Sequence, residues 1–300
     1  MINKIKDYLI GNFQSIISIF PVKVKTKHIK IKYKNLGIRL YSKKRCNNIC
    51  ILAHGMGGGQ DATYVKSMID KLINLDFDVL TFDAHGIGES ISSEKFWGGA
   101  IGDQGQLEDI LEYINRLNYS KVFAIGFSAG AGNILAYLLG GDGIKNNLKH
   151  KIDYSFFVCP TINHNEMFEN AKKDMSILRY AVSFLHTTLL IKHRLFHKKY
   201  KEALKIFKLC IFNIKNANLY GSGLYEKFYE HKPLFKINGL AILTKDEPIT
   251  TIKCTINYKK YCETIIIDNG GHLGCFNFDG TKEYEKIIIL KLKKIINSFA

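Results

Sequence analysis

Residues 122–139, which read VFAIGFSAGAGNILAYLL, decide the fold that we expect for this chain. The first four residues are all apolar, as is typical of a strand buried on both faces. The apolar run that continues to Leu139 predicts a buried helix. Between them stands G-F-S-A-G (126–130), a G-x-S-x-G motif placed between a strand and a helix. This order is typical of a nucleophile elbow, a tight turn that presents a serine above a sheet.

The two glycines of this motif have a steric purpose. A side chain at Gly126 or Gly130 would collide with the neighbouring backbone in so tight a turn. We expect Ser128 to adopt a strained conformation, with its hydroxyl above the sheet. The N-terminus of the following helix would direct its positive dipole and backbone N–H groups, including that of Ala129, toward a developing oxyanion.

Outside this stretch, short apolar runs alternate with segments of helical periodicity. Such alternation predicts βαβ units around a mostly parallel sheet, so we assign the chain to the α/β class. Before these units, Lys and apolar residues alternate over 22–33, and Asn35-Leu36-Gly37 predicts a turn into a strand at 38–41. We therefore expect an N-terminal β-hairpin or meander. The other strands are predicted at 49–53, 79–82, 155–159, 240–243 and 264–267, and the other helices at 61–75, 105–117 and 281–298.

The alternation of short apolar strands with helices stops between 161 and 237, where the sequence is basic and has the periodicity of amphipathic helices. We interpret this segment as a cap inserted into an α/β core formed by 21–160 and 238–300, and residues 1–20 as an amphipathic N-terminal segment. The apolar stretches at 8–20 and 181–191 are too short to span a bilayer, and no secretory signal is recognised.

A serine nucleophile needs a base, and the base needs a carboxylate that orients it. In α/β-hydrolases these groups follow the serine in the order acid, histidine. His272, in G-G-H-L-G (270–274) directly after a predicted strand, is the expected base, with Gly271 supporting its loop. Asp246 and Glu247 follow an earlier predicted strand, and either could be the acid.

The oxyanion would also need two backbone N–H donors. Ala129 is expected to provide one, and Met56, in the glycine-rich loop H-G-M-G-G-G (54–59), the other. His54 and Gly55 are interpreted as residues that build this loop, as is His85 in the loop after the next strand. A phosphate loop is excluded because no G-K-[ST] follows, and no cofactor is expected.

Composition limits the other classes of function. Among the 300 residues, 46% are hydrophobic and 23% are charged, which excludes a disordered chain. Seven scattered cysteines without a C-x-x-C pair indicate idle thiols in a reducing, cytoplasmic compartment. His193 and His197 have the i, i+4 spacing of metal ligands but lack the glutamate of H-E-x-x-H, so no metal site is expected.

The formal net charge of +16 is unevenly distributed. The first 45 residues contain twelve Lys and Arg residues but one acid, Asp7. Two explanations stay open: a compositional bias toward lysine, or attraction to an anionic membrane surface. Nucleic acid is not an expected partner, because no recognition motif is present and arginine is scarce.

Taken together, these motifs resemble the α/β-hydrolase superfamily. More narrowly, the chain is similar to the group that joins YheT-type bacterial esterases to mammalian abhydrolase-domain lipid hydrolases (AB hydrolase type 4). The similar features are H-G-M-G-G, GFSAGAGNILAYLLGGDG (126–143), Cys159-Pro160 and G-G-H-L-G. The resemblance covers most of the chain from about residue 20 to 298, and it implies an α/β-hydrolase fold with a helical cap and an esterase or lipase activity.

Some residues depart from the family pattern. The chain has His85-Gly86 where the family usually has Arg-Gly, and Ala131 where a glycine is common. The acid loop reads Asp246-Glu247-Pro248 instead of Asp-Asp-Pro, so the family's acid falls on Glu247 by position and on Asp246 by residue type. We favour Glu247 slightly. The expected function is a serine hydrolase of acyl, lipid-like esters; the alternative is an inactive scaffold that binds a lipid or a protein.

Overall fold

A computed structural model describes residues 23–44, 46–55, 58–85, 88–90, 104–139, 148–160, 236–247, 257–273 and 282–298. The expected N-terminal segment and nearly all of the expected cap at 161–237 lie outside the described residues. Of the helices that are described, none has the length and hydropathy needed to cross a bilayer.

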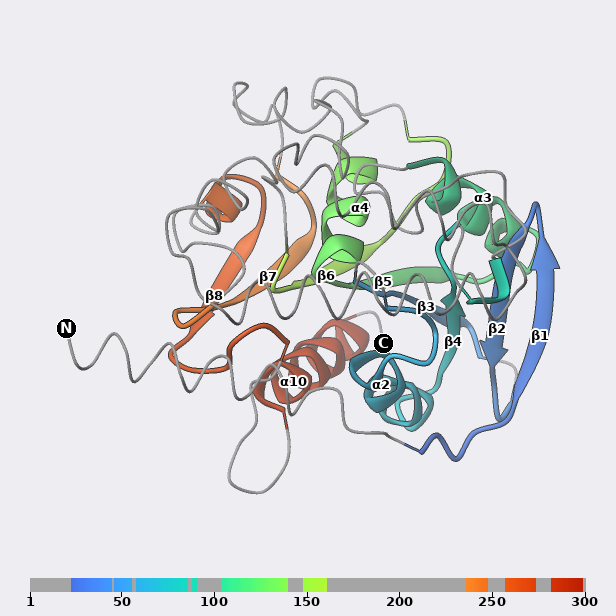
Figure 1. Ribbon diagram of the computed structural model, residues 1–300, viewed down its shortest axis with the longest axis horizontal. Helices are drawn as coiled ribbons and strands as arrows, with labels where there is room; N and C mark the ends of the chain where they lie inside the picture. Colours follow the sequence, from blue (N-terminus) through green and yellow to red (C-terminus); the bar gives the residue numbers. More distant parts are fainter. Residues whose placement is uncertain are drawn as a thin grey trace, which may run out of the picture.

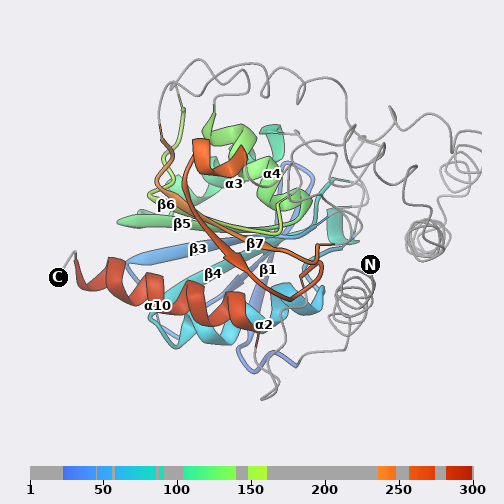
Figure 2. The ribbon, with the colours of Figure 1, turned by 90° about the vertical axis from the view of Figure 1, so that its left-hand side faces the viewer.

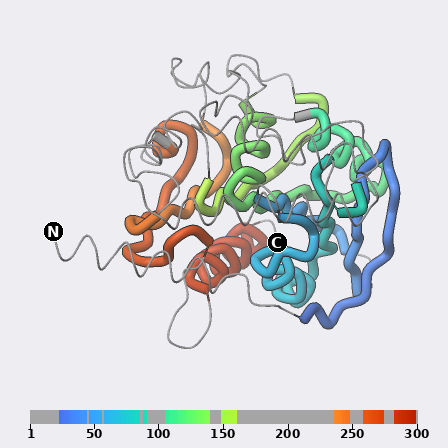
Figure 3. Tube along the Cα trace, viewed as in Figure 1, coloured from blue at the N-terminus to red at the C-terminus, as the bar shows by residue number. Residues whose placement is uncertain are grey.

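An eight-stranded sheet occupies the centre of the molecule (Figure 1). Its spatial order is β1-β2-β4-β3-β5-β6-β7-β8; β2 is antiparallel to β1 and β4, and all other neighbours are parallel. The strands are β1 (His28–Tyr33), β2 (Leu36–Tyr41), β3 (Asn48–Ala53), β4 (Phe77–Phe82), β5 (Lys121–Phe127), β6 (Tyr154–Val158), β7 (Gly239–Thr244) and β8 (Glu263–Ile267). Figure 3 shows the hairpin of β1 and β2 on one side of the molecule and β8 on the other.

Helices cover both faces of the sheet. Helices α3 (Gln104–Asn115) and α4 (Ala129–Leu138) lie on one face, and α2 (Thr63–Ile73) and α10 (Glu283–Asn297) on the other (Figure 2). Single-turn helices at Gly88–Ser90 (η1) and Asn257–Lys260 (η3) complete the described elements. The molecule is therefore the three-layer α/β sandwich that the alternating pattern predicts.

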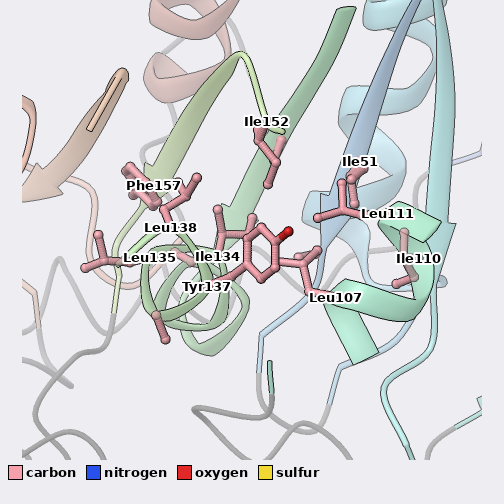
Figure 4. Packing of buried hydrophobic residues seen from close by; sticks show 14 of the residues in the cluster. Ile51, Leu107, Ile110, Leu111, Ile134, Leu135, Tyr137, Leu138, Ile152 and Phe157 are labelled. Carbon is pink, nitrogen blue, oxygen red and sulfur yellow. The ribbon is translucent and has the colours of Figure 1, made fainter. Parts of the chain in front are cut away.

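Two apolar cores, one on each face, hold the layers together. Figure 4 shows the first, which includes Leu107 and Leu111 of α3, Ile134 of α4 and Ile51 of β3. These four side chains are at most 2% exposed. Burying a side chain of this kind stabilises the fold by roughly 1.5–3 kcal/mol, so the apolar runs fix which face each helix covers.

The N-terminal hairpin differs in detail from the prediction. Its turn is formed by Lys34 and Asn35, with φ of 46° and 68°, and β2 begins at Leu36 instead of after Gly37. A two-residue turn with two positive φ angles matches the twist of the strands that it joins. Asparagine tolerates this conformation, but lysine gives no such signal.

The strand expected from residue 22 begins only at His28. The preceding chain is instead attached to α2, because the backbone N–H groups of Lys25 and Thr26 donate to the Asp70 carboxylate at 2.8 and 3.1 Å. All other strand and helix boundaries lie within two residues of the predicted ones.

The order of the strands positions the functional region. The chain passes from β3 outward to β4 and then returns to β5 on the other side of β3. At such a reversal a crevice opens at the carboxyl ends of the strands, where α/β proteins bind their ligands. Ala53 pairs with Gly126 at this end, so His54 and Ser128 follow adjacent strands.

Candidate active site

Ser128 connects β5 to α4 in a strained backbone conformation. Its φ of 52° and ψ of −117° lie outside the regions that L-residues favour, which costs on the order of 1–3 kcal/mol. Backbone hydrogen bonds hold it there: its N–H donates to Val158 O at 2.9 Å, and its carbonyl accepts from Ala131 N at 3.1 Å. The side chain sits at the carboxyl end of the sheet and is buried.

The glycines on either side of Ser128 have no room for a side chain. A Cβ at Gly126 would lie 2.4 Å from Ala131 Cα, and one at Gly130 would lie 2.4 Å from Ala53 O. Both contacts are with backbone, which cannot move aside as a flexible side chain can. A side chain at either glycine would therefore collide with the backbone, as the tightness of the turn predicts.

His272, five residues after β8, lies beside the serine. Its Nε2 is 2.9 Å from Ser128 Oγ, and its Nδ1 is 3.0 Å from each carboxylate oxygen of Glu247. Because an ionised carboxylate only accepts, the imidazole proton belongs on Nδ1. Nε2 is then left to accept the hydrogen of the serine hydroxyl, as a general base must.

The two neighbouring acids have different partners. Glu247 faces the imidazole, whereas Asp246 accepts the backbone N–H groups of Gly270 and Gly271 at 3.0 and 2.9 Å. Thr244 Oγ1 also donates to Gly271 O at 2.9 Å. Asp246 thus holds the backbone of the loop that carries His272, and of the two acids Glu247 is the one hydrogen-bonded to the imidazole ring.

The loop after β3 runs close to Ser128. A Cβ at Gly55 would lie 3.1 Å from Ser128 Cβ, and the Gly55 N–H donates to the Tyr64 hydroxyl at 3.0 Å. Met56, the expected oxyanion donor in this loop, lies outside the described residues. Ala129, the other expected donor, is the first residue of α4, where the backbone N–H has no acceptor within the helix.

His54 builds this loop from within. Its Nδ1 donates to Gly55 O at 2.6 Å, and its Nε2 accepts the Ala84 N–H at 3.0 Å. Burial lowers the pKa of His54 despite the opposing charge of Asp83. A neutral imidazole, with one donor and one acceptor, is what these two bonds require. His85 also lies in a loop, where its backbone N–H donates to Gln106 Oε1 at 3.3 Å.

Buried hydrogen bonds between Asp83 and Gln60 are not indicated by any motif in the sequence. The Asp83 carboxylate accepts the backbone N–H and the side-chain amide of Gln60 at 2.8 and 3.0 Å, and the Glu89 N–H at 2.7 Å. It thereby joins the loop after β3 to the loop after β4. The position of Asp83 directly after a buried strand is the signal that could have drawn attention to it.

Cys159 belongs to the Cys159-Pro160 pair on which the family resemblance partly rests, but no motif gives its thiol a role. It directly follows β6, is 1% exposed and has a φ of 44°. Potential ligand atoms of Cys159, Glu247 and His272 all lie within 4.8 Å of one another. The structure thus brings a thiol to the acid and the histidine, and no spacing in the sequence indicated this.

No protein-family model matches the chain, and no curated protein matches it in sequence. Solved structures do match it in fold. An esterase from Pyrococcus furiosus superposes with a TM-score of 0.62 at 15% identity, covering 91% of both chains. An esterase from Exiguobacterium antarcticum gives 0.57 at 15% identity, covering 89% of this chain and all of the other. An α/β serine hydrolase without a lid from Xanthomonas campestris gives 0.51 at 12% identity, covering 93% and 97%. The chain therefore has the predicted α/β-hydrolase fold.

Proposed function

We propose that this protein is a serine hydrolase that cleaves carboxylic acyl esters. The observation that carries the proposal is the uninterrupted hydrogen-bond chain from Ser128 Oγ through His272 to Glu247, with heavy-atom distances of 2.9 and 3.0 Å. The strained backbone of the serine and the helix N-terminus behind it fit the same chemistry. That similarly folded proteins are named esterases adds an argument by analogy only.

The proposed reaction begins with attack of Ser128 Oγ on the ester carbonyl carbon while His272 Nε2 takes the hydroxyl proton. Glu247 stabilises the imidazolium that forms. The backbone N–H groups of Ala129 and Met56 stabilise the tetrahedral oxyanion. The C–O bond to the alcohol then breaks, the alcohol leaves with the proton from His272, and the serine remains acylated. Water, deprotonated by the same histidine, then attacks the acyl carbon. The bond from that carbon to Ser128 Oγ breaks as His272 returns the proton to Oγ, which releases the carboxylic acid and restores the enzyme.

A fluorophosphonate probe, which forms a covalent bond with activated serines, tests this mechanism. We expect the wild type to be labelled and Ser128→Ala to be unlabelled. Ser120→Ala is a suitable control, since Ser120 is exposed in the turn before β5 and its backbone, not its side chain, is hydrogen-bonded to Asn47. Equal labelling of wild type and Ser128→Ala would overturn the proposal. A folded wild type that neither reacts with the probe nor hydrolyses any ester would favour the inactive, ligand-binding scaffold.

Lipid-like esters presented at an anionic membrane surface are the substrates that we propose. The support is the net charge of +16 and the resemblance to abhydrolase-domain lipid hydrolases. Lysines on β1 and in the segment before it extend this charge over the described part of the chain, where Lys25, Lys27 and Lys30 are exposed. Each lysine near an anionic surface contributes about 1 kcal/mol of attraction, which salt screens.

Flotation of the full chain with lipid vesicles tests the membrane partner. We expect the protein to float with vesicles that contain phosphatidylserine and to be released as the salt concentration rises. Vesicles of phosphatidylcholine alone are the control and should retain little protein. Equal flotation with both kinds of vesicle, or none with either, would contradict an electrostatic membrane contact and leave the lysine bias as the explanation of the charge.

A further inference from the structure

Three side chains of kinds that can bind a metal ion come together beside the proposed catalytic serine. Cys159 follows β6, Glu247 lies three residues after β7, and His272 lies five residues after β8. The strands are neighbours in the sheet, so their carboxyl ends bring these residues together. The ligand atoms lie within 4.8 Å of one another, and the side chains of Glu247 and His272 are 2% and 11% exposed.

The chemistry of these donors suits a soft divalent cation. A thiolate, an imidazole nitrogen and a carboxylate oxygen are the three protein ligands that zinc uses, often with water in the fourth position. Tetrahedral zinc bonds of about 2.3 Å to sulfur and 2.0–2.1 Å to nitrogen separate those ligand atoms by about 3.5 Å. The cluster is thus at most somewhat wider than a zinc site, and side-chain movements on the order of 1 Å would close it.

The ligands are also held in place by their surroundings. Asp246 fixes the loop of His272 through the two glycine N–H groups, and the Cys159 thiol contacts Gly271 O at 3.8 Å. Outer contacts of this kind orient metal ligands and strengthen metal binding. The cluster therefore differs from a chance grouping of exposed acids and histidines on a surface.

We propose that Zn²⁺, or another soft divalent cation, binds to Cys159, Glu247 and His272 Nδ1 and reversibly inhibits the enzyme. Binding displaces the thiol proton to solvent, and the Nδ1 proton of the neutral imidazole moves to Nε2. Nε2 is the nitrogen that faces Ser128 Oγ, so the imidazole can no longer accept the serine proton. Glu247 is simultaneously withdrawn from its orienting role. The inhibition rests on the proposed hydrolase function, whereas the binding does not.

Binding is measured first in the Ser128→Ala protein, which retains all three ligands and needs no activity. Zn²⁺ is titrated against a chromophoric chelator in this protein and in versions that also carry Cys159→Ser or Cys262→Ser. Cys262, 5% exposed beside β8, is the control for loss of a buried thiol. We expect Cys159→Ser to weaken binding by more than about 100-fold, the upper range for losing an outer-shell partner alone. Cys262→Ser should leave binding unchanged.

Cobalt provides a second measurement that identifies the ligand. Co²⁺ bound to the Ser128→Ala protein should give a thiolate-to-cobalt charge-transfer absorption that Cys159→Ser removes and Cys262→Ser retains. Circular dichroism establishes that each variant is folded. Zn²⁺ binding or a cobalt band that survives Cys159→Ser in folded protein overturns the proposed site.

The inhibition is then tested with Ser128 intact. The Zn²⁺ concentration that halves ester hydrolysis, relative to each protein's own metal-free rate, should rise more than about 100-fold in Cys159→Ser and stay unchanged in Cys262→Ser. Zinc binding by a protein without measurable esterase activity would support the metal site and reject the proposed hydrolase function. Activity that Zn²⁺ does not reduce, although the site is filled, would reject the inhibitory role.

Discussion

At the scale of single residues, the adjacent carboxylates Asp246 and Glu247 have separate tasks. Glu247→Gln leaves the imidazole with a neutral partner that cannot stabilise its positive charge. We expect kcat for ester hydrolysis to fall on the order of 10³–10⁴-fold. The free energy of unfolding, measured with urea, should change little, since glutamine fills the same space. A loss of activity below tenfold would remove Glu247 from the proposed mechanism.

Asp246→Asn is the matched contrast to this variant. The amide replaces one acceptor oxygen by a donor, which leaves one of the Gly270 and Gly271 N–H groups without its partner. The free energy of unfolding should fall by roughly 1–3 kcal/mol, the cost of an unsatisfied buried donor. Activity should fall much less than in Glu247→Gln. Asp268→Asn is the control, since Asp268 is 75% exposed and pairs with the exposed Lys245. Stronger inactivation by Asp246→Asn than by Glu247→Gln would reverse the two assignments.

The residues alone bring the choice of acid down to these two neighbours, and the family resemblance adds a slight preference for Glu247 by position. Both follow β7, the strand before the one that leads to His272, at a point where the chain leaves the regular sheet geometry. The alternation of side chains no longer determines which residue points at the histidine. The answer depends on the path of the loop, which the two hydrogen bonds from Gly270 and Gly271 to Asp246 help to fix.

At the scale of an element, the turn between β5 and α4 contains the G-x-S-x-G motif and holds Ser128 at a positive φ, a backbone strain that can be measured. Glycine adopts positive φ without the penalty that a Cβ imposes. Ser128→Gly should therefore be more stable than Ser128→Ala, by roughly 1 kcal/mol. Thermal or urea unfolding of these two variants measures the difference directly. If Ser128→Ala is the more stable of the two, the backbone at this position is not strained.

The hairpin of β1 and β2 shows where element-level prediction stops. Apolar alternation correctly indicated two antiparallel strands, but not that Lys34 would take a positive φ in the turn. The segment before β1 also alternates, yet it is bound to Asp70 of α2 instead of to a strand. Alternation of apolar and polar residues indicates which segments can form a strand. Whether such a segment pairs with another strand depends on which neighbouring strand lies close enough.

At the scale of the whole molecule, the buried imidazole of His54, in the loop after β3, makes the free energy of unfolding depend on pH. Burial lowers its pKa below the value of about 6.5 that it has in the unfolded chain. Below pH 6.5 the unfolded chain binds a proton that the folded protein resists, so stability declines as the pH falls.

We expect the wild type to lose roughly 1–2 kcal/mol more of its free energy of unfolding between pH 7 and pH 5 than His54→Gln. Urea unfolding at the two pH values measures this difference. His28→Gln, at an exposed position on β1, is the control and should retain most of the wild-type slope. Identical pH dependence of wild type and His54→Gln would show that His54 binds its proton equally in both states.

The assembly of the whole site also has a consequence for protein synthesis. Ser128 and His272 are 144 positions apart, and the histidine is held by a loop that follows the last strand of the sheet. While a ribosome is still making the chain, the Ser128 hydroxyl after β5 is already present but lacks the histidine that could remove its proton. The proposed nucleophile therefore becomes reactive only when the C-terminal part of the domain has emerged and packed against the rest. Chains that are still being synthesised should not hydrolyse esters.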